Sequence, residues 1–106
     1  MRHGAHTAII ARKEDRLKST AEHFSSLFAN TNQRCIYHTA DVCSVEQLSA
    51  AFDFILNELH SIDILINGAA GNFLSLADKI SFSAFKKIVE IDCVGTFNCC
   101  RMAFDK

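Results

Sequence analysis

The sequence predicts an α/β fold built on a doubly wound parallel sheet. Three short runs, residues 6–11, 34–41 and 62–67, are rich in apolar and β-forming side chains and have the length of buried strands. The segments between them place apolar residues every three or four positions, as amphipathic helices do. Strands without polar alternation that take turns with helices are typical of a parallel sheet covered on both faces.

The first half of the chain predicts a strand, a helix and a second strand. "HTAIIA" at 6–11 is short and apolar, which indicates a buried strand. A helix over 13–29 follows, because four apolar residues fall on one helical face: Leu17, Ala21, Phe24 and Phe28. "RCIYHTAD" at 34–41 is rich in β-formers and predicts the second strand.

A second helix is predicted to begin just after Ser44. Ser44 and Gln47 have the spacing of a capping box, in which each side chain binds the backbone N–H of the other residue. The apolar positions that follow keep a helical spacing: Val45, Leu48, Phe52, Ile55 and Leu59. This regularity makes the segment the clearest helix in the chain.

The remainder predicts a third strand, a loop and two helices. "IDILIN" at 62–67 is the strand, and a run of small residues follows it. Ser81 is placed to cap a short helix through Ile91. A further helix is predicted from about Val94 to the end, so the expected order is β-α-β-α-β-loop-α-α.

Composition indicates an ordinary soluble globular protein of at most one small domain. The chain has 106 residues, 49% hydrophobic and 22% charged, and a net charge of -1. That charge gives no reason to expect nucleic acid or an anionic membrane surface as a partner. No apolar run approaches the roughly 20 residues of a membrane span, and neither a secretory signal nor a C-terminal peroxisomal address is expected in this chain.

The cysteines and histidines do not predict a metal site or a disulfide framework. The five cysteines (Cys35, Cys43, Cys93, Cys99, Cys100) are odd in number and lack C-x-x-C spacing, which favours reduced, buried thiols. The five histidines are scattered and no cluster of carboxylates joins them, so we expect no bound metal.

The first predicted strand is followed by cations, at the position where a dinucleotide site would contact the adenosine ribose. Ligands of open parallel sheets lie beyond the carboxyl ends of the strands. An acid there would favour NAD, whereas Arg12 and Lys13, with Arg16 one turn later, suit a 2′-phosphate. Alternatively this is a solvated helix start, which Glu14 and Asp15 support.

The other two strand ends add weaker signals. Asp41 could accept a hydrogen bond from the amine of an adenine, with the Val42 backbone nearby, although Asp is also common in turns. Asn67 precedes four small residues at 68–71, which let backbone approach a flat or charged ligand closely. A simple glycine turn is the alternative, but such a turn does not need four small residues.

These three strand ends, in this order and spacing, resemble the short-chain dehydrogenase/reductase superfamily. "NGAA" at 67–70 stands where that superfamily usually has "NNAG". "AAGNF" at 69–73 is similar to the 2,4-dienoyl-CoA reductases. "SFSAF" at 81–85 and "EIDCVGTFN" at 90–98 are similar to the peroxisomal branch of that family. The resemblance extends over essentially the whole chain.

The resemblance implies NADPH as hydride donor and a 2,4-dienoyl-CoA as acceptor, reduced to a trans-3-enoyl-CoA in a peroxisome. It also implies a homo-oligomer for the full-length protein. The cofactor-binding residues that it implies are Arg12, Lys13, Glu14, Asp15, Arg16, Asp41, Val42, Asn67, Gly68 and Ala69. The implied substrate-binding residues are Arg12, Phe73, Ser81, Phe82 and Ser83.

Three single residues refine this resemblance. Asp92 stands where the superfamily usually has Asn, and the peroxisomal branch resembles this sequence in having Asp, which with a downstream Lys orients a water as proton donor. Alternatively Asp92 is an ordinary residue at a helix junction. Cys43 replaces a frequent basic residue, which removes one CoA-phosphate contact. Tyr37 has no Lys four residues later and does not match the superfamily's catalytic Tyr.

We therefore expect residues 1–106 to form a partial NADP-binding, Rossmann-like domain truncated at both ends. The glycine-rich turn, the first strand and the C-terminal half are not in this sequence. In the strand order 3-2-1-4, the first strand lies between 6–11 and 62–67, so we predict that the chain alone is inactive and poorly folded. Alternatives are another short-chain reductase of acyl thioesters, or a non-catalytic isoform that pairs with full-length subunits.

Overall fold

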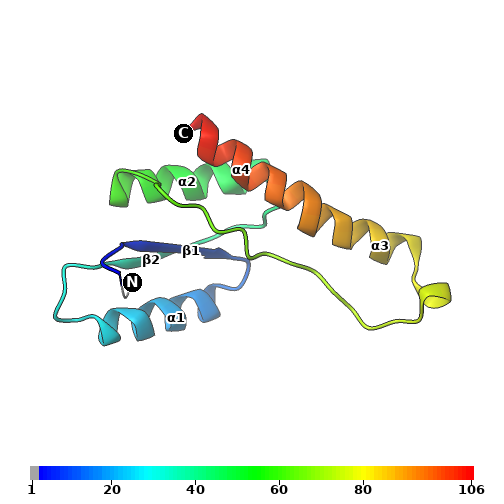
Figure 1. Ribbon diagram of the computed structural model, residues 1–106, viewed down its shortest axis with the longest axis horizontal. Helices are drawn as coiled ribbons and strands as arrows, with labels where there is room; N and C mark the ends of the chain where they lie inside the picture. Colours follow the sequence, from blue (N-terminus) through cyan, green and yellow to red (C-terminus); the bar gives the residue numbers. More distant parts are fainter. Residues whose placement is uncertain (1–2) are drawn as a thin grey trace.

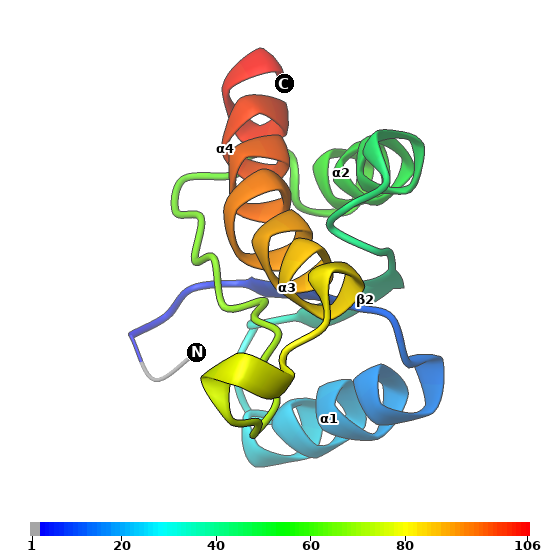
Figure 2. The same ribbon diagram turned by 90° about the vertical axis from the view of Figure 1, so that its right-hand side faces the viewer.

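The computed structural model describes residues 3–106, in which a two-stranded parallel sheet has helices on both faces. Helices α2 and α4 lie on one face of the strands and α1 lies on the other (Figure 1; Figure 2 shows the same layers after a quarter turn). This layering confirms the predicted α/β class. The elements are β1 Thr7–Ala11, α1 Glu14–Leu27, β2 Cys35–Thr39, α2 Val45–Leu59, η1 Ala77–Lys79, α3 Phe82–Val89, η2 Glu90–Gly95 and α4 Thr96–Asp105.

The register of the sheet brings two strand ends side by side. β1 and β2 run parallel, with Thr7 opposite Cys35 and Ala11 opposite Thr39. One further hydrogen bond, from the Ala40 N–H to the Ala11 carbonyl at 3.0 Å, extends the pairing past the last strand residue. The segments that follow the two strands therefore leave the sheet at the same edge, where parallel sheets bind ligands.

Helix α2 supplies most of the core. Leu48 and Phe52 are almost completely buried, and they pack with Ala51, with Ala40 at the end of β2 and with Cys99 of α4. On the other face of the sheet, α1 buries two residues at the predicted spacing, Leu17 and Ala21. Within residues 3–106, no helix combines the length and hydrophobicity needed to cross a membrane.

The cap of α2 differs in one half from the predicted capping box. Ser44 is the N-cap, and its Oγ accepts a hydrogen bond from the Gln47 N–H at 3.3 Å, as predicted. The Gln47 side chain does not return to Ser44. It accepts instead from the Asp41 N–H at 2.9 Å, while the Ser44 N–H donates to the Asp41 carbonyl. Gln47 therefore ties the start of α2 to the turn that follows β2.

The predicted strand at 62–67 is wrong as a strand. Residues 61–76 contain no regular structure, and within residues 3–106 the sheet consists of β1 and β2 only. The apolar pattern of this segment is typical of a strand, but a strand needs a hydrogen-bonded neighbour, and within residues 3–106 no strand pairs with it. Ile64 and Ile66 are consequently 78% and 85% exposed.

The predicted break between two C-terminal helices is also wrong. α3, the π-helical segment η2 and α4 follow one another without interruption from Phe82 to Asp105. Ser81 caps this run as predicted, by accepting from the Ala84 N–H at 3.2 Å. Gly95 does not end the helix, because it keeps helical dihedral angles (φ -60, ψ -43). The short helix η1 was not predicted from the sequence.

Candidate functional site

The turn after β2 brings Asp41 and its neighbours to the carboxyl edge of the sheet. The Asp41 Oδ1 atom accepts a hydrogen bond from the Cys43 N–H at 2.9 Å, which holds the carboxylate over the turn. This hydrogen bond lowers the pKa of Asp41 and outweighs its partial burial, and the positive charges of Lys87 and Arg12 lower it further. Asp41 is therefore an ionised acceptor that lies near two cations.

Cys43 is the neutral member of this group. Partial burial raises the pKa of the Cys43 thiol, and the neighbouring Asp41 carboxylate raises it further through a hydrogen bond and its charge. Lys87 opposes this effect and Glu90 adds to it, which places both side chains near the thiol. At neutral pH, Cys43 therefore contributes no charge to the site.

The small-residue loop is tied to the helical run at two points. The Gly71 N–H donates to Asp92 Oδ1 at 2.7 Å, and the Asn67 side chain donates to Cys100 Sγ at 3.3 Å. A Cβ atom at Gly71 would lie 3.1 Å from Ile91, so a small residue suits the close approach. Asp92 lies within the π-helical segment, a type of irregularity often found at functional sites.

The helical run also contacts the turn after β2. The Asn98 side chain donates to the Val42 carbonyl at 3.0 Å. A Cβ atom added to Gly95 would lie only 2.5 Å from Val42 Cγ2, so the helix approaches this turn as closely as a glycine permits. The turn, the loop and the helix thus form one connected edge around residues 41–43 and 67–73.

A groove of about 340 Å³ lies between the end of β1, the loop and α3. Arg12 and Lys87 are the charged residues that line it among the described residues. The rest of the lining is uncharged: Gly71, Asn72, Phe73, Ala84, Ile88 and Ile91. A concave surface with an apolar wall and a few charged groups has the composition of a small-molecule site.

The structure brings some of the predicted site residues together and leaves others apart. Arg12 and Phe73 line the groove, Asp41 and Val42 form the adjacent turn, and Asp92 is bonded to the loop. Outside the groove lining are the exposed residues of the α1 start, the loop start and the α3 cap: Lys13, Glu14, Asp15, Arg16, Asn67, Gly68, Ala69, Ser81, Phe82 and Ser83. Phe82 is 98% exposed.

Sequence reasoning missed Lys87, Gly95 and Asn98. Lys87 shares a helical face with the apolar lining residues Ala84, Ile88 and Ile91, and the i, i+3, i+4, i+7 spacing of these four residues was visible in the sequence. The contacts of Gly95 and Asn98 with Val42 depend on one continuous helical run, and the predicted break after Ile91 did not include such a run.

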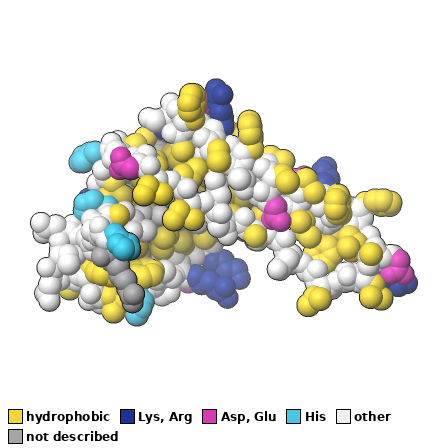
Figure 3. All heavy atoms as spheres, viewed as in Figure 1, with side chains coloured by type: hydrophobic (Ala, Val, Ile, Leu, Met, Phe, Trp, Pro, Cys, Tyr) yellow, Lys and Arg dark blue, Asp and Glu magenta, His cyan; other side chains and the backbone are white. Residues whose placement is uncertain are grey.

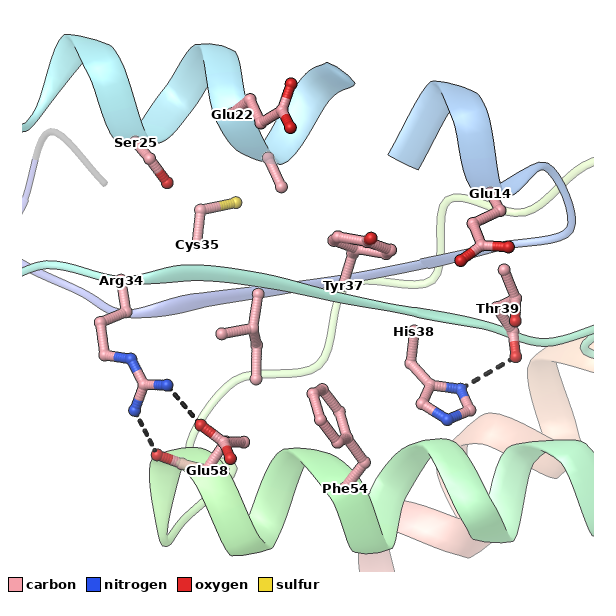
Figure 4. A pocket seen from close by; sticks show the side chains of 12 residues that line it. Glu14, Glu22, Ser25, Arg34, Cys35, Tyr37, His38, Thr39, Phe54 and Glu58 are labelled. Atoms are coloured by element: carbon pink, nitrogen blue, oxygen red, sulfur yellow. Dashed lines mark hydrogen bonds and ion pairs between the residues drawn. The ribbon is translucent and has the colours of Figure 1, made fainter. Parts of the chain in front are cut away.

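A larger hollow of about 650 Å³ lies elsewhere, against the outer edge of β2 between α1 and α2. Figure 4 shows Arg34 reaching Glu58 at one end, and His38 beside Phe54, with ring centroids 5.3 Å apart. Glu14 also lines this hollow. It is the space beside a strand edge that has no partner within residues 3–106, and it does not contain Arg12, Asp41 or Asp92.

Comparisons with known proteins agree with this geometry. The peroxisomal 2,4-dienoyl-CoA reductase [(3E)-enoyl-CoA-producing] of Rattus norvegicus is 46% identical over 106 residues, which are 100% of this chain and 35% of the relative. The protein of the same name from Danio rerio is 42% identical over 100% of this chain and 34% of its own length. The chain thus spans about a third of the length of these curated relatives.

The fold has well-matched solved structures. An alcohol dehydrogenase of the archaeon Thermococcus sibiricus, complexed with 5-hydroxy-NADP, superimposes with a TM-score of 0.86 at 21% identity, over 98% of this chain and 43% of that one. At this identity the match speaks for the fold alone. The family model of the short chain dehydrogenases matches residues 1–106, and the chain therefore belongs to the short chain dehydrogenase family.

Proposed function

We propose that this chain is the part of an NADPH-dependent 2,4-dienoyl-CoA reductase that holds the adenosine end of the cofactor and one wall of the acyl site. The observation that carries this proposal is the 46% identity, over the whole chain, to a peroxisomal 2,4-dienoyl-CoA reductase of the rat. The groove at the carboxyl edge of the sheet supports it, because such sheets bind nucleotides at that edge.

The arrangement of charge supports NADPH rather than NADH. Arg12 follows β1 directly and lines the groove, and Lys13 and Arg16 lie within the next turn of chain. A guanidinium binds a phosphate monoester through two parallel charge-assisted hydrogen bonds. Asp41, held ionised, is the acceptor for the exocyclic amine of the adenine, and the Val42 backbone lies beside it.

The loop supplies backbone rather than side chains to the cofactor. Asn67, Gly68 and Ala69 are exposed and present a chain of small residues at the edge of the sheet. No φ angle there requires glycine, and nothing lies within 4 Å of a Cβ built on Gly68. The open side of this loop faces the ribose and pyrophosphate in the proposal.

Asp92 is proposed to hold the water that delivers the proton. Reduction of a conjugated dienoyl thioester needs one hydride and one proton, and bound NADPH would supply the hydride. Asp92 Oδ1 is fixed by the Gly71 N–H, so the carboxylate has a defined orientation. Its Oδ2 atom is the one that we assign to the water, which protonates the carbon next to the thioester carbonyl and leaves the double bond between the third and fourth carbons.

The test is a steady-state assay on the complete product of the gene that encodes this chain. With 2,4-hexadienoyl-CoA, we expect NADPH to be oxidised and a 3-enoyl-CoA to form, with NADH a much poorer donor. Asp92→Asn should lower kcat by roughly 10²–10⁴-fold, the usual contribution of a positioned proton donor, with little change in KM for NADPH. Turnover of a 2-enoyl or 3-oxoacyl thioester in place of the dienoyl substrate would favour another short-chain reductase.

Three further properties belong to the same proposal. We infer a peroxisomal location and a homo-oligomeric state for the complete protein, and absence of turnover for residues 1–106 alone. Fluorescence microscopy with a peroxisomal marker checks the first, and light scattering of the purified protein checks the second. Recovery of NADPH-dependent dienoyl-CoA turnover from the 106-residue chain would contradict the third.

A further inference from the structure

The groove contains a second cation that the proposed function does not yet use. Lys87 comes from α3 and Arg12 from the end of β1, so two separate elements bring positive charge to one concavity. Ile88, Ile91 and Phe73 form the apolar part of the same lining. A site of this composition suits an anionic group attached to an uncharged body.

The carboxylates around Lys87 leave it able to bind a ligand. Its Nζ atom lies 3.8 Å from Glu90 Oε2, and Lys86 Nζ lies 3.9 Å from the other oxygen of the same carboxylate. The side chains of Lys87 and Glu90 are 51% and 38% exposed, and long, exposed ion pairs of this kind contribute little. Asp41 also faces Lys87, but it is already bonded to the Cys43 N–H. A dianionic phosphate attracts the ammonium group more strongly than either carboxylate.

Among the described residues, Lys87 and Arg12 are the cations whose charge acts on Asp41 at the end of β2. Cys43, the residue of that turn next to both Asp41 and Lys87, is a neutral thiol because burial and the Asp41 charge raise its pKa. Within residues 3–106, the positive charges that influence Asp41 are those of Lys87 and Arg12. Any phosphate that enters the groove from this side therefore meets these two side chains.

We propose that Lys87 and Arg12 together bind a phosphate monoester of the ligand that occupies this groove. The inference deepens the proposed function, and two sources of the same chemistry exist there: the 2′-phosphate of NADPH and the 3′-phosphate of CoA. Arg12 supplies a planar fork for two phosphate oxygens, and Lys87 supplies a mobile point charge from a second element, α3.

The experiment is calorimetric titration of the complete gene product with three nucleotides. Adenosine 2′,5′-bisphosphate carries the monoester of NADPH, adenosine 3′,5′-bisphosphate carries that of CoA, and 5′-ADP carries neither. We expect Lys87→Gln to weaken the binding of one bisphosphate on the order of ten-fold, as loss of a charge-assisted hydrogen bond does, without weakening 5′-ADP. The bisphosphate that is affected identifies the source.

Lys86→Gln is the matched control. Lys86 is the preceding residue, shares Glu90 with Lys87, has a side chain that is 78% exposed and does not line the groove. Its substitution should leave all three affinities unchanged. Cys43→Lys in the Lys87→Gln background should restore part of the lost affinity, because it places a cation in the neighbouring turn after β2, close to where the Lys87 charge acts.

Two results would overturn the inference: unchanged binding of both bisphosphates by Lys87→Gln, or an equal loss with Lys86→Gln. The titration needs no turnover. A protein that binds a bisphosphate through Lys87 yet does not reduce a dienoyl-CoA would refute the proposed reaction and keep the phosphate site.

Discussion

Gly95 controls how closely the helical run approaches the turn after β2. A methyl group at this position would lie 2.5 Å from Val42 Cγ2 and 3.0 Å from Val42 Cβ, distances that van der Waals repulsion forbids. Gly95→Ala should therefore push the helix from the turn and destabilise the fold by about 1–3 kcal/mol, the usual cost of overpacking. Denaturant unfolding of the complete gene product measures this change.

Two variants separate this clash from the helix propensity of alanine. Val42→Ala removes the Cγ2 atom, so the double variant should recover most of the stability that Gly95→Ala alone loses. Gly68→Ala adds a methyl group where nothing lies within 4 Å, and it should be neutral or slightly stabilising. Equal effects of the Gly95 and Gly68 substitutions would contradict the steric explanation.

Asp41 should make the stability of the fold depend on pH. The Cys43 N–H first, and Lys87 and Arg12 next, hold the pKa of Asp41 below its usual range against the effect of burial. A lowered folded-state pKa contributes stability that is present above the unfolded-state value and is lost as the pH falls through the folded-state value. Asp41→Asn should therefore cost most at neutral pH.

The measurement is the free energy of unfolding of wild type and Asp41→Asn across an acid titration. Asn keeps an oxygen acceptor for the Cys43 N–H, so the variant removes mainly the charge. The difference between the two proteins should shrink on acidification below the unfolded-state pKa. A difference that stays constant with pH would mean that the charge of Asp41 does not stabilise the fold.

At the scale of the elements, the start of α2 connects the core to the site. Ser44 caps the helix, and the Gln47 side chain accepts a hydrogen bond from the Asp41 N–H. Ser44→Ala should cost about 1 kcal/mol, as the loss of an N-cap does, and Ser44→Asp should retain most of the cap. Gln47→Ala should cost roughly 0.5–1.5 kcal/mol and loosen the Asp41 turn.

Chemical denaturation ranks these variants, and hydrogen exchange of the Asp41 amide separates the two effects. Gln47→Ala should accelerate that exchange more than Ser44→Ala, because only Gln47 accepts from this N–H. Equal acceleration would indicate that the turn opens together with the whole first turn of α2.

Elements with their own periodic signal were predictable, and those that depend on distant partners were not. Five apolar residues at helical spacing predicted α2, and four predicted α1. Whether 62–67 forms a ladder depends on a neighbouring strand, which no local pattern shows. The unbroken run from α3 to α4 was missed because the predicted break lay between Ile91 and Val94, where a π-helical segment, which no local sequence pattern marks, continues the helix.

The site divides in the same way. Arg12 and Asp41 follow strands, so the rule that parallel sheets bind ligands at their carboxyl ends was enough to select them. Lys87 lies on a helix beside Lys86 and Glu90, where nothing in the sequence marks it, and only the tertiary fold places it in the same groove lining as Arg12. Tertiary contact, rather than composition, decides which surface charges meet.

At the scale of the whole molecule, residues 3–106 are more extended than an ordinary domain. The radius of gyration is 15.8 Å, whereas a compact chain of this length has about 13 Å. Figure 1 shows α3 and the preceding loop projecting from the body, and Figure 3 shows hydrophobic side chains exposed along that projection. Leu74 and Phe82 are almost fully exposed. Apolar surface of this kind is a site of association.

The sheet adds a second source of association. In the doubly wound order 3-2-1-4, a further strand would lie between β1 and residues 62–67, and residues 3–106 form no strand there. The free edge of β1 and the residues 62–67, which form no strand, therefore present unpaired backbone groups that can template further strand pairing. Ile64 and Ile66 are the most exposed apolar residues of that segment.

We therefore predict that residues 1–106 alone self-associate, and that Ile64→Lys with Ile66→Lys reduces this association. Two charges on the segment discourage strand pairing between copies, since charged side chains protect natural sheet edges. Light scattering over a concentration series measures the effect. Asp63→Lys adds the same positive charge to the segment without removing an exposed apolar side chain, so an equal reduction would assign the effect to charge alone, and a smaller one to the lost isoleucines as well.

The same pair of substitutions should be harmful in a protein in which a further strand lies between β1 and residues 62–67. There the two isoleucines would be buried between helices, and each lysine would place a charge in the core at a cost of several kcal/mol. The double variant should consequently improve the behaviour of the isolated chain and unfold the complete gene product. If it is tolerated equally in both, the segment 62–67 is not a core strand of the complete protein.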